Sequence, residues 1–333
     1  MNTSGASVPD PGGNTRAQQA QSEGDGPGGL AHDPRWPRAG DWPAWAPGLR
    51  ADAVLVGIPT WRTSLSPGQA HTTPAAIRDA LRYYSADALA RLDGSRVTVL
   101  DAGDVPEPDG SGEQAATARV AELASSASLV IVLGGDNAAT VPAALGAWGE
   151  RVGAAGLVTL DAHHDLRDGT TNGSPVRRLL EAGLAGERVS QLGIEPLANS
   201  GAYAARATGH GITVVTRAEL LSTPIEVAMT EALDCAASTG GPVHVDLDLD
   251  VCDRSVAPGC PASVPGGLSA IELRTAARLA GAHPAVTSID LTELDAARDT
   301  ADQRTVRLAA LCVLEALAGL ASRPAAAHVR MTA

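Results

Sequence analysis

Residues 156–165, GLVTLDAHHD, join a short apolar run to a cluster of acidic residues and histidines. An apolar run of this length, bounded by polar residues, is typical of a buried β-strand. Similar runs recur after residue 50, and segments with helix start signals lie between them. Because strands that alternate with helices form parallel sheets covered on both faces, the sequence predicts one doubly wound α/β domain with about eight strands.

The apolar runs and helix starts define the expected order of elements. The predicted strands are Ala53–Gly57, Val97–Leu100, Leu129–Leu133, Gly156–Leu160, Val189–Leu192, Ile212–Val215, Val243–Leu247 and Val286–Leu291. A capping residue followed by proline predicts helix starts at Thr73-Pro74, Ser174-Pro175 and Thr223-Pro224. Ser269 and Glu272 fit a capping box at another helix start. We find no internal repeat or linker that would divide the domain.

Composition sets the expected boundaries of this domain. The chain has 333 residues, 44% of them hydrophobic, which is enough for one large α/β domain. Residues 1–49 are rich in Gly, Pro, Ser, Gln and Asp and are predicted to be a disordered leader. The domain is expected at 50–323 and a tail at 324–333. Trp36, Trp42 and Trp45 either pack onto the domain or belong to a loosely docked tail.

Charge and cysteine content exclude some classes of partner. The net charge of −13 argues against binding to a nucleic-acid backbone. The four cysteines form no CxxC pair, which favours reduced structural thiols over a disulfide framework or zinc site. No apolar run approaches the roughly 20 residues that cross a bilayer, and the N-terminus does not resemble a signal peptide. We therefore expect a cytoplasmic protein that binds neither nucleic acid nor membranes.

Polar clusters follow four of the predicted strands. They are GGDN at 134–137, DAHHD at 161–165, DLDLD at 246–250 and DLTE at 290–293. Ligands of open parallel sheets bind outside the carboxyl ends of the strands, so these clusters can converge on one crevice. Alternate residues of an extended segment share one side, so Asp161, His163 and Asp165 can face one point, as can Asp248 and Asp250. Burying so many anions together requires cations that neutralise them.

The types of ligand identify the expected metal. Carboxylates with one imidazole and no thiolate suit Mn²⁺ or Mg²⁺ better than Zn²⁺ or copper. Two such ions could share carboxylates and hold a bridging hydroxide as the nucleophile. The alternative interpretation, a strand-end turn and a solvated loop, is less favoured because two such clusters each follow an apolar strand. His164 points away from its neighbours in an extended segment and is expected to have a supporting or packing role, and His244 is expected to be a core residue with satisfied polar groups.

Three motifs resemble the signatures of a known family. GGDN, DAHHD and DLDVCDRSVAPG are similar to the GGDH, DAHxD and DxDxxDPxxAPG motifs of the ureohydrolases, the arginase and agmatinase family. The similarity extends from about Val54 to about Leu317 and so covers nearly the whole domain. The resemblance implies a three-layer α/β/α fold with a mostly parallel eight-stranded sheet. It also implies a binuclear Mn²⁺ centre and assembly into trimers or hexamers.

The resemblance assigns a role to each residue of the acidic clusters. Asp161 and Asp248 resemble the carboxylates that bridge both metals. Asp165 resembles the ligand of the first metal that also contacts the hydroxide and protonates the leaving amine. His163 and Asp250 resemble the remaining ligands of the second metal.

Other motif positions are expected to bind substrate or to mark a branch of the family. Glu293 resembles the acid that pairs with the cationic amidine or guanidinium group. Asn137 stands where the family has a histidine ligand of the first metal, and an amide is a weaker donor, so this Mn²⁺ is expected to be loosely held. Asn172 replaces the proton-shuttling histidine of arginases and is expected to contact substrate. These departures, with Cys252 and Arg254 in CDR, are similar to the formimidoylglutamase branch.

The resemblance implies a Mn²⁺-dependent hydrolase of an amidine C–N bond. Formimidoylglutamase, which converts N-formimidoyl-L-glutamate and water to L-glutamate and formamide, is the favoured activity. An agmatinase or guanidino-acid hydrolase is the alternative enzyme, and a catalytically decayed binding or regulatory subunit is the alternative of another class. The substrate's carboxylates need a cation, and we expect Arg177, beside the helix start at Pro175, to bind one, with Arg167 as the second candidate.

Overall fold

The computed structural model describes residues 1, 33, 35–89 and 96–323 of the chain. The predicted tail and most of the predicted leader lie outside these residues. Contacts divide the chain into two units, and the larger begins at Arg38, before the expected boundary at residue 50. Ala39 is buried, and the Trp45 indole nitrogen donates to the Ser126 hydroxyl at 3.1 Å. Trp42 and Trp45 also pack against apolar clusters of the sheet, so both belong to the folded domain.

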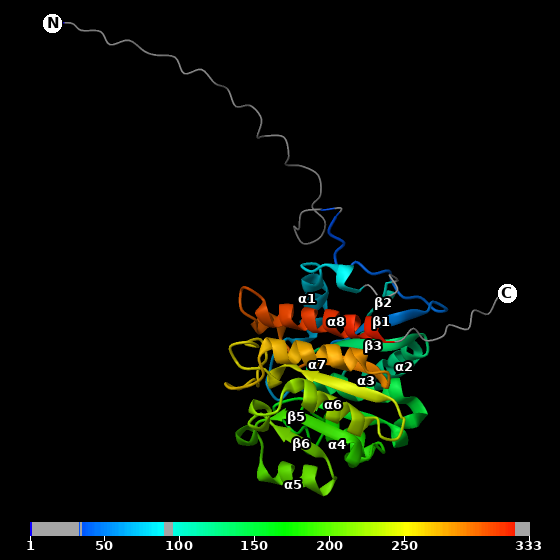
Figure 1. Cartoon of the computed structure of the whole chain (residues 1–333), viewed down its shortest axis with the longest axis vertical. Helices are drawn as coiled ribbons and strands as arrows, with labels where there is room; N and C mark the ends of the chain where they lie inside the picture. The colour runs from blue at the N-terminus through cyan, green and yellow to red at the C-terminus, as the bar shows by residue number, and fades with distance from the viewer. Residues whose placement is uncertain (2–32, 34, 90–95, 324–333) are drawn as a thin grey trace. The chain divides into compact units, whose positions relative to one another are not determined.

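Eight described strands form one parallel sheet (Figure 1). They are β1 (Ala51–Ile58), β2 (Val99–Asp104), β3 (Ala127–Gly134), β4 (Gly156–Leu160), β5 (Val189–Ile194), β6 (Thr213–Thr216), β7 (Val243–Asp248) and β8 (Val286–Thr292). Their spatial order is β2-β1-β3-β8-β7-β4-β5-β6. All eight predicted strands are confirmed, with β2 displaced toward its carboxyl end. The sheet is parallel at every pairing.

Helices cover both faces of the sheet, which confirms the three-layer α/β/α fold. The described α-helices are α1 (Thr73–Leu81), α2 (Glu113–Ala124), α3 (Thr140–Trp148), α4 (Pro175–Glu181), α5 (Gly201–Gly209), α6 (Ile225–Ala236), α7 (Ala270–Ala282) and α8 (Arg304–Ser322). α1, α6, α7 and α8 share one apolar core with the sheet. α2 to α5 pack on the opposite face through two smaller apolar clusters.

The helix starts follow the predicted signals in part. Ser269 and Glu272 form the expected capping box at the start of α7, each side chain accepting from the other's backbone N–H. α4 begins at Pro175 as predicted. Pro224 instead precedes the first residue of α6, because its ψ of 141° is extended and not helical. α1 begins one residue early, at Thr73.

The central strands β7 and β8 carry a ladder of paired polar side chains on one face. In register, His244 pairs with Ser288, Asp246 with Asp290, and Asp248 with Thr292 (all six are buried). His244 Nδ1 lies 2.7 Å from Ser288 Oγ, and its Nε2 lies 3.2 Å from Asp290 Oδ2. As expected, His244 is a buried core residue that makes polar contacts.

α8 is long and apolar enough to cross a membrane by length and composition alone. However, 78% of its most apolar stretch is buried inside the protein, where α8 packs against α7 and α1. Helices α7 and α8 approach closely at two glycines. A Cβ on Gly281 would lie 2.0 Å from the Ala316 carbonyl oxygen, and one on Gly319 would lie 2.1 Å from the Arg278 carbonyl oxygen. α8 is therefore a core helix that packs closely against α7.

We expect Gly281→Ala to lower the free energy of unfolding by about 1–3 kcal/mol, because the methyl group forces two helix backbones apart. Alanine has a higher helix propensity than glycine by roughly 1 kcal/mol, so the expected loss of stability comes from packing and not from helix propensity. Gly201→Ala in α5 is the matched control, since its Cβ would meet no atom within 4 Å. Urea denaturation measures both variants. Equal stability of the two would contradict the close packing of α7 and α8.

Candidate metal centre

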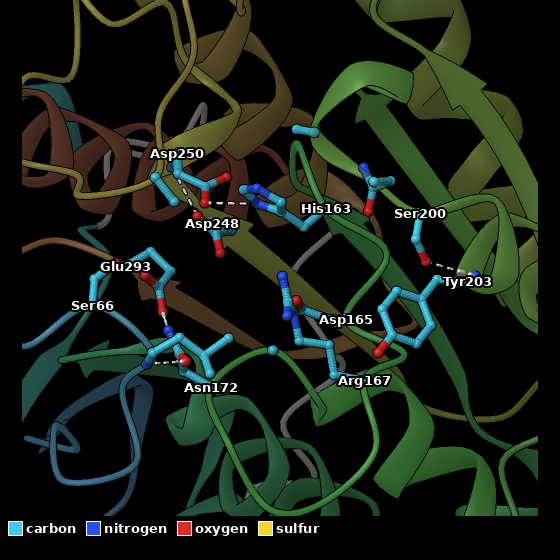
Figure 2. A pocket seen from close by; sticks show the side chains of 15 residues that line it. Ser66, His163, Asp165, Arg167, Asn172, Ser200, Tyr203, Asp248, Asp250 and Glu293 are labelled. Carbon is cyan, nitrogen blue, oxygen red and sulfur yellow. Dashed lines mark hydrogen bonds and ion pairs between the residues drawn. The ribbon is translucent and has the colours of Figure 1, made fainter.

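The four polar clusters lie together because their strands are neighbours. They follow or end β3, β4, β7 and β8, which occupy adjacent places in the sheet as β3-β8-β7-β4. Since the strands are parallel, their carboxyl ends meet at one edge. Figure 2 shows His163, Asp165, Asp248, Asp250 and Glu293 around one cavity at this edge. The predicted convergence of the clusters is present in the structure.

The ligand atoms form two groups that share Asp161. Asp161, His163 and Asp250 make the first group, and Asp161, Asp165 and Asp248 make the second. Within each group the candidate ligand atoms lie within 4.8 Å of one another. His163 Nδ1 is 3.0 Å from Asp250 Oδ2 and 3.4 Å from Asp161 Oδ1. Of the two predicted bridging carboxylates, Asp161 belongs to both groups and Asp248 to one. The bridging roles of both residues stay predictions.

Local backbone geometry holds these side chains in place. Asp248 caps the short 3-10 helix that follows β7 by accepting from the Asp250 N–H at 2.8 Å. Asp161 Oδ1 accepts from the His163 N–H at 2.6 Å. Asp165 and Glu293 have φ values of 52° and 58°, in the left-handed region that costs non-glycine residues about 1–3 kcal/mol. Such strain is tolerated where the surrounding structure fixes a side chain in a functional direction.

Because several acids are buried together, most of them bind protons more tightly than exposed carboxylates do. Burial and the nearby Asp250 carboxylate raise the pKa of Asp161 to about 7. Burial and neighbouring carboxylates also raise the pKa values of Asp165 and Asp248 well above the usual range. Burial opposes protonation of His163, but Asp250 and Asp161 outweigh it and raise its pKa to about 12. Divalent cations would replace these protons and stabilise the ionised carboxylates.

The donor set fits hard divalent cations. The two groups together offer four carboxylates and one imidazole, and no thiolate belongs to either group in the described residues. This composition suits Mn²⁺ or Mg²⁺ and is unfavourable for copper. The site therefore has the charge, burial and ligand types of a binuclear centre.

Comparison with known proteins agrees with this geometry. The sequence model of the Arginase family matches residues 51–319. The chain belongs to the arginase family. Proteins of this family are hydrolases with a binuclear metal centre. This chain has the arginase fold and is a metal-dependent amidine hydrolase.

Individual relatives indicate which members of the arginase family this chain is most similar to. The formimidoylglutamase of Bacillus subtilis is 34% identical over 283 residues, covering 81% of this chain and 88% of the relative. Its crystal structure superposes with a TM-score of 0.82 at 30% identity, over 90% of this chain and 96% of that chain. The proclavaminate amidinohydrolase of Streptomyces clavuligerus is 30% identical, over 80% and 89% of the two chains. The Trypanosoma cruzi formiminoglutamase, solved with Mn²⁺, has a TM-score of 0.72 at 27% identity, over 82% and 95%.

Asn137 lies against the cluster, with its amide nitrogen toward the acids. Asn137 Nδ2 donates to Asp165 Oδ2 at 2.5 Å. Its Oδ1 accepts from the Thr140 and Thr292 hydroxyls at 2.5 and 3.1 Å. In this arrangement the amide oxygen is already used by two hydroxyl groups. The predicted ligand role of Asn137 stays a prediction, and the geometry favours a supporting hydrogen bond to Asp165.

Glu293 and Asn172 form a hydrogen-bonded pair at the cavity, as Figure 2 shows. Glu293 Oε1 accepts from Asn172 Nδ2 at 2.6 Å and from the Asn137 N–H at 2.8 Å. Asn172 Oδ1 in turn accepts from the Leu65 N–H at 2.9 Å. Burial and the nearby Asp136 raise the pKa of Glu293 to about 8. A cationic substrate group would favour the ionised form, which fits the predicted role of Glu293.

Arg177, the arginine that we expected to bind a substrate carboxylate, is not among the residues that line the cavity. Its Nε donates to the Arg167 carbonyl at 2.7 Å, and its terminal nitrogens bind the Gly169 carbonyl and Glu181. Each of the three guanidinium nitrogens therefore has a partner within the protein. Arg167, our second candidate, lines the cavity instead. The cause is local: the loop after β4 folds back over the start of α4, and its carbonyl groups accept hydrogen bonds from the Arg177 side chain.

The cavity also has walls that the motifs did not indicate. Leu65 and Ser66 come from the loop after β1, and Ser200 and Tyr203 come from the start of α5. No signature motif covers these residues. Ser200 had a detectable signal, because serine before a helix is a common cap, and its side chain does accept from the Tyr203 N–H. That signal predicts a helix start and not a role in binding.

The raised pKa values predict how metal-free protein responds to pH. Asp161 and Glu293 bind protons more tightly when folded than when unfolded, where their pKa values are about 4. Their contribution to stability is complete below about pH 4 and is lost as the pH rises through about 7 and 8. Chelator-treated protein should therefore melt at a lower temperature at about pH 8.5 than at about pH 5.5. Added Mn²⁺ should remove this decline, because cations stabilise the ionised acids.

Asp161→Asn should weaken this pH dependence, whereas Asp302→Asn, at an exposed surface aspartate, should leave it unchanged. Differential scanning calorimetry measures the melting temperatures. A metal-free protein that becomes more stable as the pH rises would contradict the assignment of these acids as a cation-requiring cluster.

Replacement of Asn137 tests its place at the first metal. Asn137→His should raise the affinity for the more weakly bound Mn²⁺, because imidazole is a better donor than an amide. The more tightly bound ion serves as the internal control, and its affinity should not change. Titration calorimetry separates the two binding steps. Unchanged affinity at both would show that residue 137 does not face a metal.

Proposed function

We propose that this protein is a formimidoylglutamase that hydrolyses N-formimidoyl-L-glutamate to L-glutamate and formamide. The observation that carries the proposal is the cavity of about 440 Å³, which has the acidic cluster on one side and Arg167 among its other lining residues. This volume accommodates an amino-acid derivative. The similarity to curated formimidoylglutamases supports the same substrate.

Two Mn²⁺ ions per subunit would be held by the two ligand groups that share Asp161. When bound, such ions lower the pKa of an attacking water and polarise the group that it attacks. With Asp161, His163 and Asp250 would hold one ion, and Asp165 and Asp248 would hold the other. The second ion would be held less tightly, because Asn137 stands where the family has a histidine. Mn²⁺ is favoured over Mg²⁺ because a histidine is present.

The chain's own side chains orient the substrate and handle a proton. Glu293, buried at the cavity edge and fixed by Asn172, would pair with the cationic formimidoyl group. Water adds its oxygen to the formimidoyl carbon, and the bond from this carbon to the glutamate nitrogen breaks. Asp165, whose pKa is raised by burial and by the Asp161 carboxylate, is suited to deliver the proton that the departing amine needs. The products are then L-glutamate and formamide.

The alternative functions have less support. Agmatine carries a second cation, which Arg167 at the cavity would repel. Proclavaminate amidinohydrolase is a more distant relative by identity than the Bacillus formimidoylglutamase. A decayed binding subunit would not need to keep the five acidic and histidine ligand positions together with Glu293. We therefore favour an active enzyme for an anionic amidine.

We further propose a cytoplasmic protein that assembles into a trimer or hexamer and binds neither nucleic acid nor membranes. The four cysteines support a reducing environment, since all are free thiols and three are buried. The net charge of −13 supports the absence of nucleic-acid binding. The oligomeric state rests on resemblance to the family.

A hydrolysis screen tests the substrate. With added Mn²⁺, wild-type protein should hydrolyse formimidoylglutamate with a higher kcat/KM than arginine, agmatine or guanidinobutyrate. Asp161→Ala and Asp248→Ala should each lose at least about a hundredfold in kcat, because each removes a charged metal ligand. Arg304→Ala, at an exposed residue that does not line the cavity, serves as a folded control. Preference for agmatine, or full activity in either aspartate variant, would refute the proposal.

A further inference from the structure

The cavity has a second polar wall that the acidic cluster and Glu293 do not explain. It is built by Arg167, on the loop after β4, and by Ser200 and Tyr203 at the start of α5. Figure 2 shows Ser200 and Tyr203 across the cavity from Glu293, with the Arg167 side chain extending into the space between. We infer that these three residues form a carboxylate subsite that selects anionic amidines. The inference rests on the proposed function and names its specificity determinant.

Arg167 combines a fixed backbone with an available guanidinium group. Its N–H donates to the Gly173 carbonyl at 2.9 Å, and its carbonyl accepts from Arg177 Nε at 2.7 Å. Within the described residues, its side chain has no hydrogen-bond or ion-pair partner. The nearby Arg178 guanidinium is paired with Glu113, and that of Arg177 with Glu181. Arg167 is the one arginine among the described residues that line the cavity, and a planar guanidinium suits a carboxylate.

The start of α5 adds hydroxyl groups beside Arg167. Ser200 Oγ accepts from the Tyr203 N–H at 3.3 Å, so its own proton remains available for donation. Tyr203 makes no side-chain hydrogen bond to the described residues, and its hydroxyl group can also donate. Asn199 cannot contribute, because its amide is bound to the His164 N–H and to the Ala162 and Glu195 carbonyls. The wall thus offers one cation and two hydroxyl donors.

The two walls match the charges of one class of substrate. An amidine carbon held at the acidic cluster and Glu293 places the rest of the molecule toward Arg167. In formimidoylglutamate, the side-chain carboxylate lies farthest from that carbon and would meet the guanidinium group. In agmatine, an ammonium group occupies the corresponding end and would be repelled. Arg167 therefore both attracts the anionic substrate and excludes the cationic one.

Gly173 allows Arg167 to occupy this position. A Cβ on Gly173 would lie 2.7 Å from Arg167 Cδ and 3.1 Å from its Nε. Because an arginine side chain is flexible, an added methyl group would displace it and keep its charge in the protein. Gly173→Ala therefore keeps the guanidinium group in the protein but moves it, so this variant tests whether the position of the group matters.

Steady-state kinetics on the Mn²⁺-loaded full chain tests the subsite. The substrates are formimidoylglutamate and formimidoylglutamine, in which a neutral amide replaces the side-chain carboxylate. Arg167→Ala should raise KM for formimidoylglutamate about tenfold or more, as expected for a charged hydrogen bond, and change KM for formimidoylglutamine much less. Arg167→Lys should recover part of the loss, and Gly173→Ala should reproduce it. The kcat values and the Mn²⁺ content should change little in all three variants.

Arg304→Ala is the matched control, because it removes an exposed arginine that pairs with Asp302 outside the cavity. If Arg167→Ala has the wild-type KM for formimidoylglutamate, or raises KM for both substrates equally, the inference is overturned and the hydrolase assignment stands. A wild type that does not turn over formimidoylglutamate refutes the proposed function instead. In that case, calorimetry with L-glutamate decides the subsite: weaker binding to Arg167→Ala supports it, and equal binding overturns it.

Discussion

The concentration of buried carboxylates at one edge of the sheet is the constraint on which the rest of the structure depends. Asp165, Asp248, Asp250 and Glu293 are buried around one cavity that His163 also lines, and the buried Asp161 joins them through the two ligand groups. Several ionised acids in a medium of low polarity are unstable unless cations or protons compensate them. The fold meets this demand by placing the acids together, so that shared cations can neutralise several of them at once.

The polar ladder beneath the acids extends this constraint into the sheet. Along β7, His244 and Asp246 precede Asp248 on the same face, and along β8 Asp290 precedes Thr292. The opposite face of both strands is apolar and joins the main core under α6, α7 and α8. A sheet centre that is polar on one side therefore relies on the other side for its hydrophobic stabilisation. Because of this asymmetry, the packing of α7 and α8 stabilises the strands that carry the site, although neither helix lines the cavity.

Much of the fold and part of the site could be predicted, because the signals are local. Apolar runs fix strands, and polar residues directly after them fix strand-end ligands such as Asp161 and His163. The order β3-β8-β7-β4 was not readable from periodicity, since it is set by packing between distant segments. The side-chain directions of Arg177 and Asn137 were equally inaccessible, because each depends on hydrogen bonds to residues that no motif marks. Arg177 binds loop carbonyls, and Asn137 binds two threonines.

The hydrogen bonds of Asn172 show how the cavity acquires a fixed shape. Its amide links the Leu65 N–H, in the loop after β1, to the Glu293 carboxylate after β8. The Gly173 carbonyl, on the next residue, holds the backbone of Arg167. Two adjacent residues, Asn172 and Gly173, thus position the acid that is expected to bind the amidine and the arginine that is expected to bind the carboxylate. Because both are tied to one short segment, the backbone fixes the spacing between the Glu293 carboxylate and the base of the Arg167 side chain. Such fixed spacing lets the site discriminate between substrates by length as well as by charge.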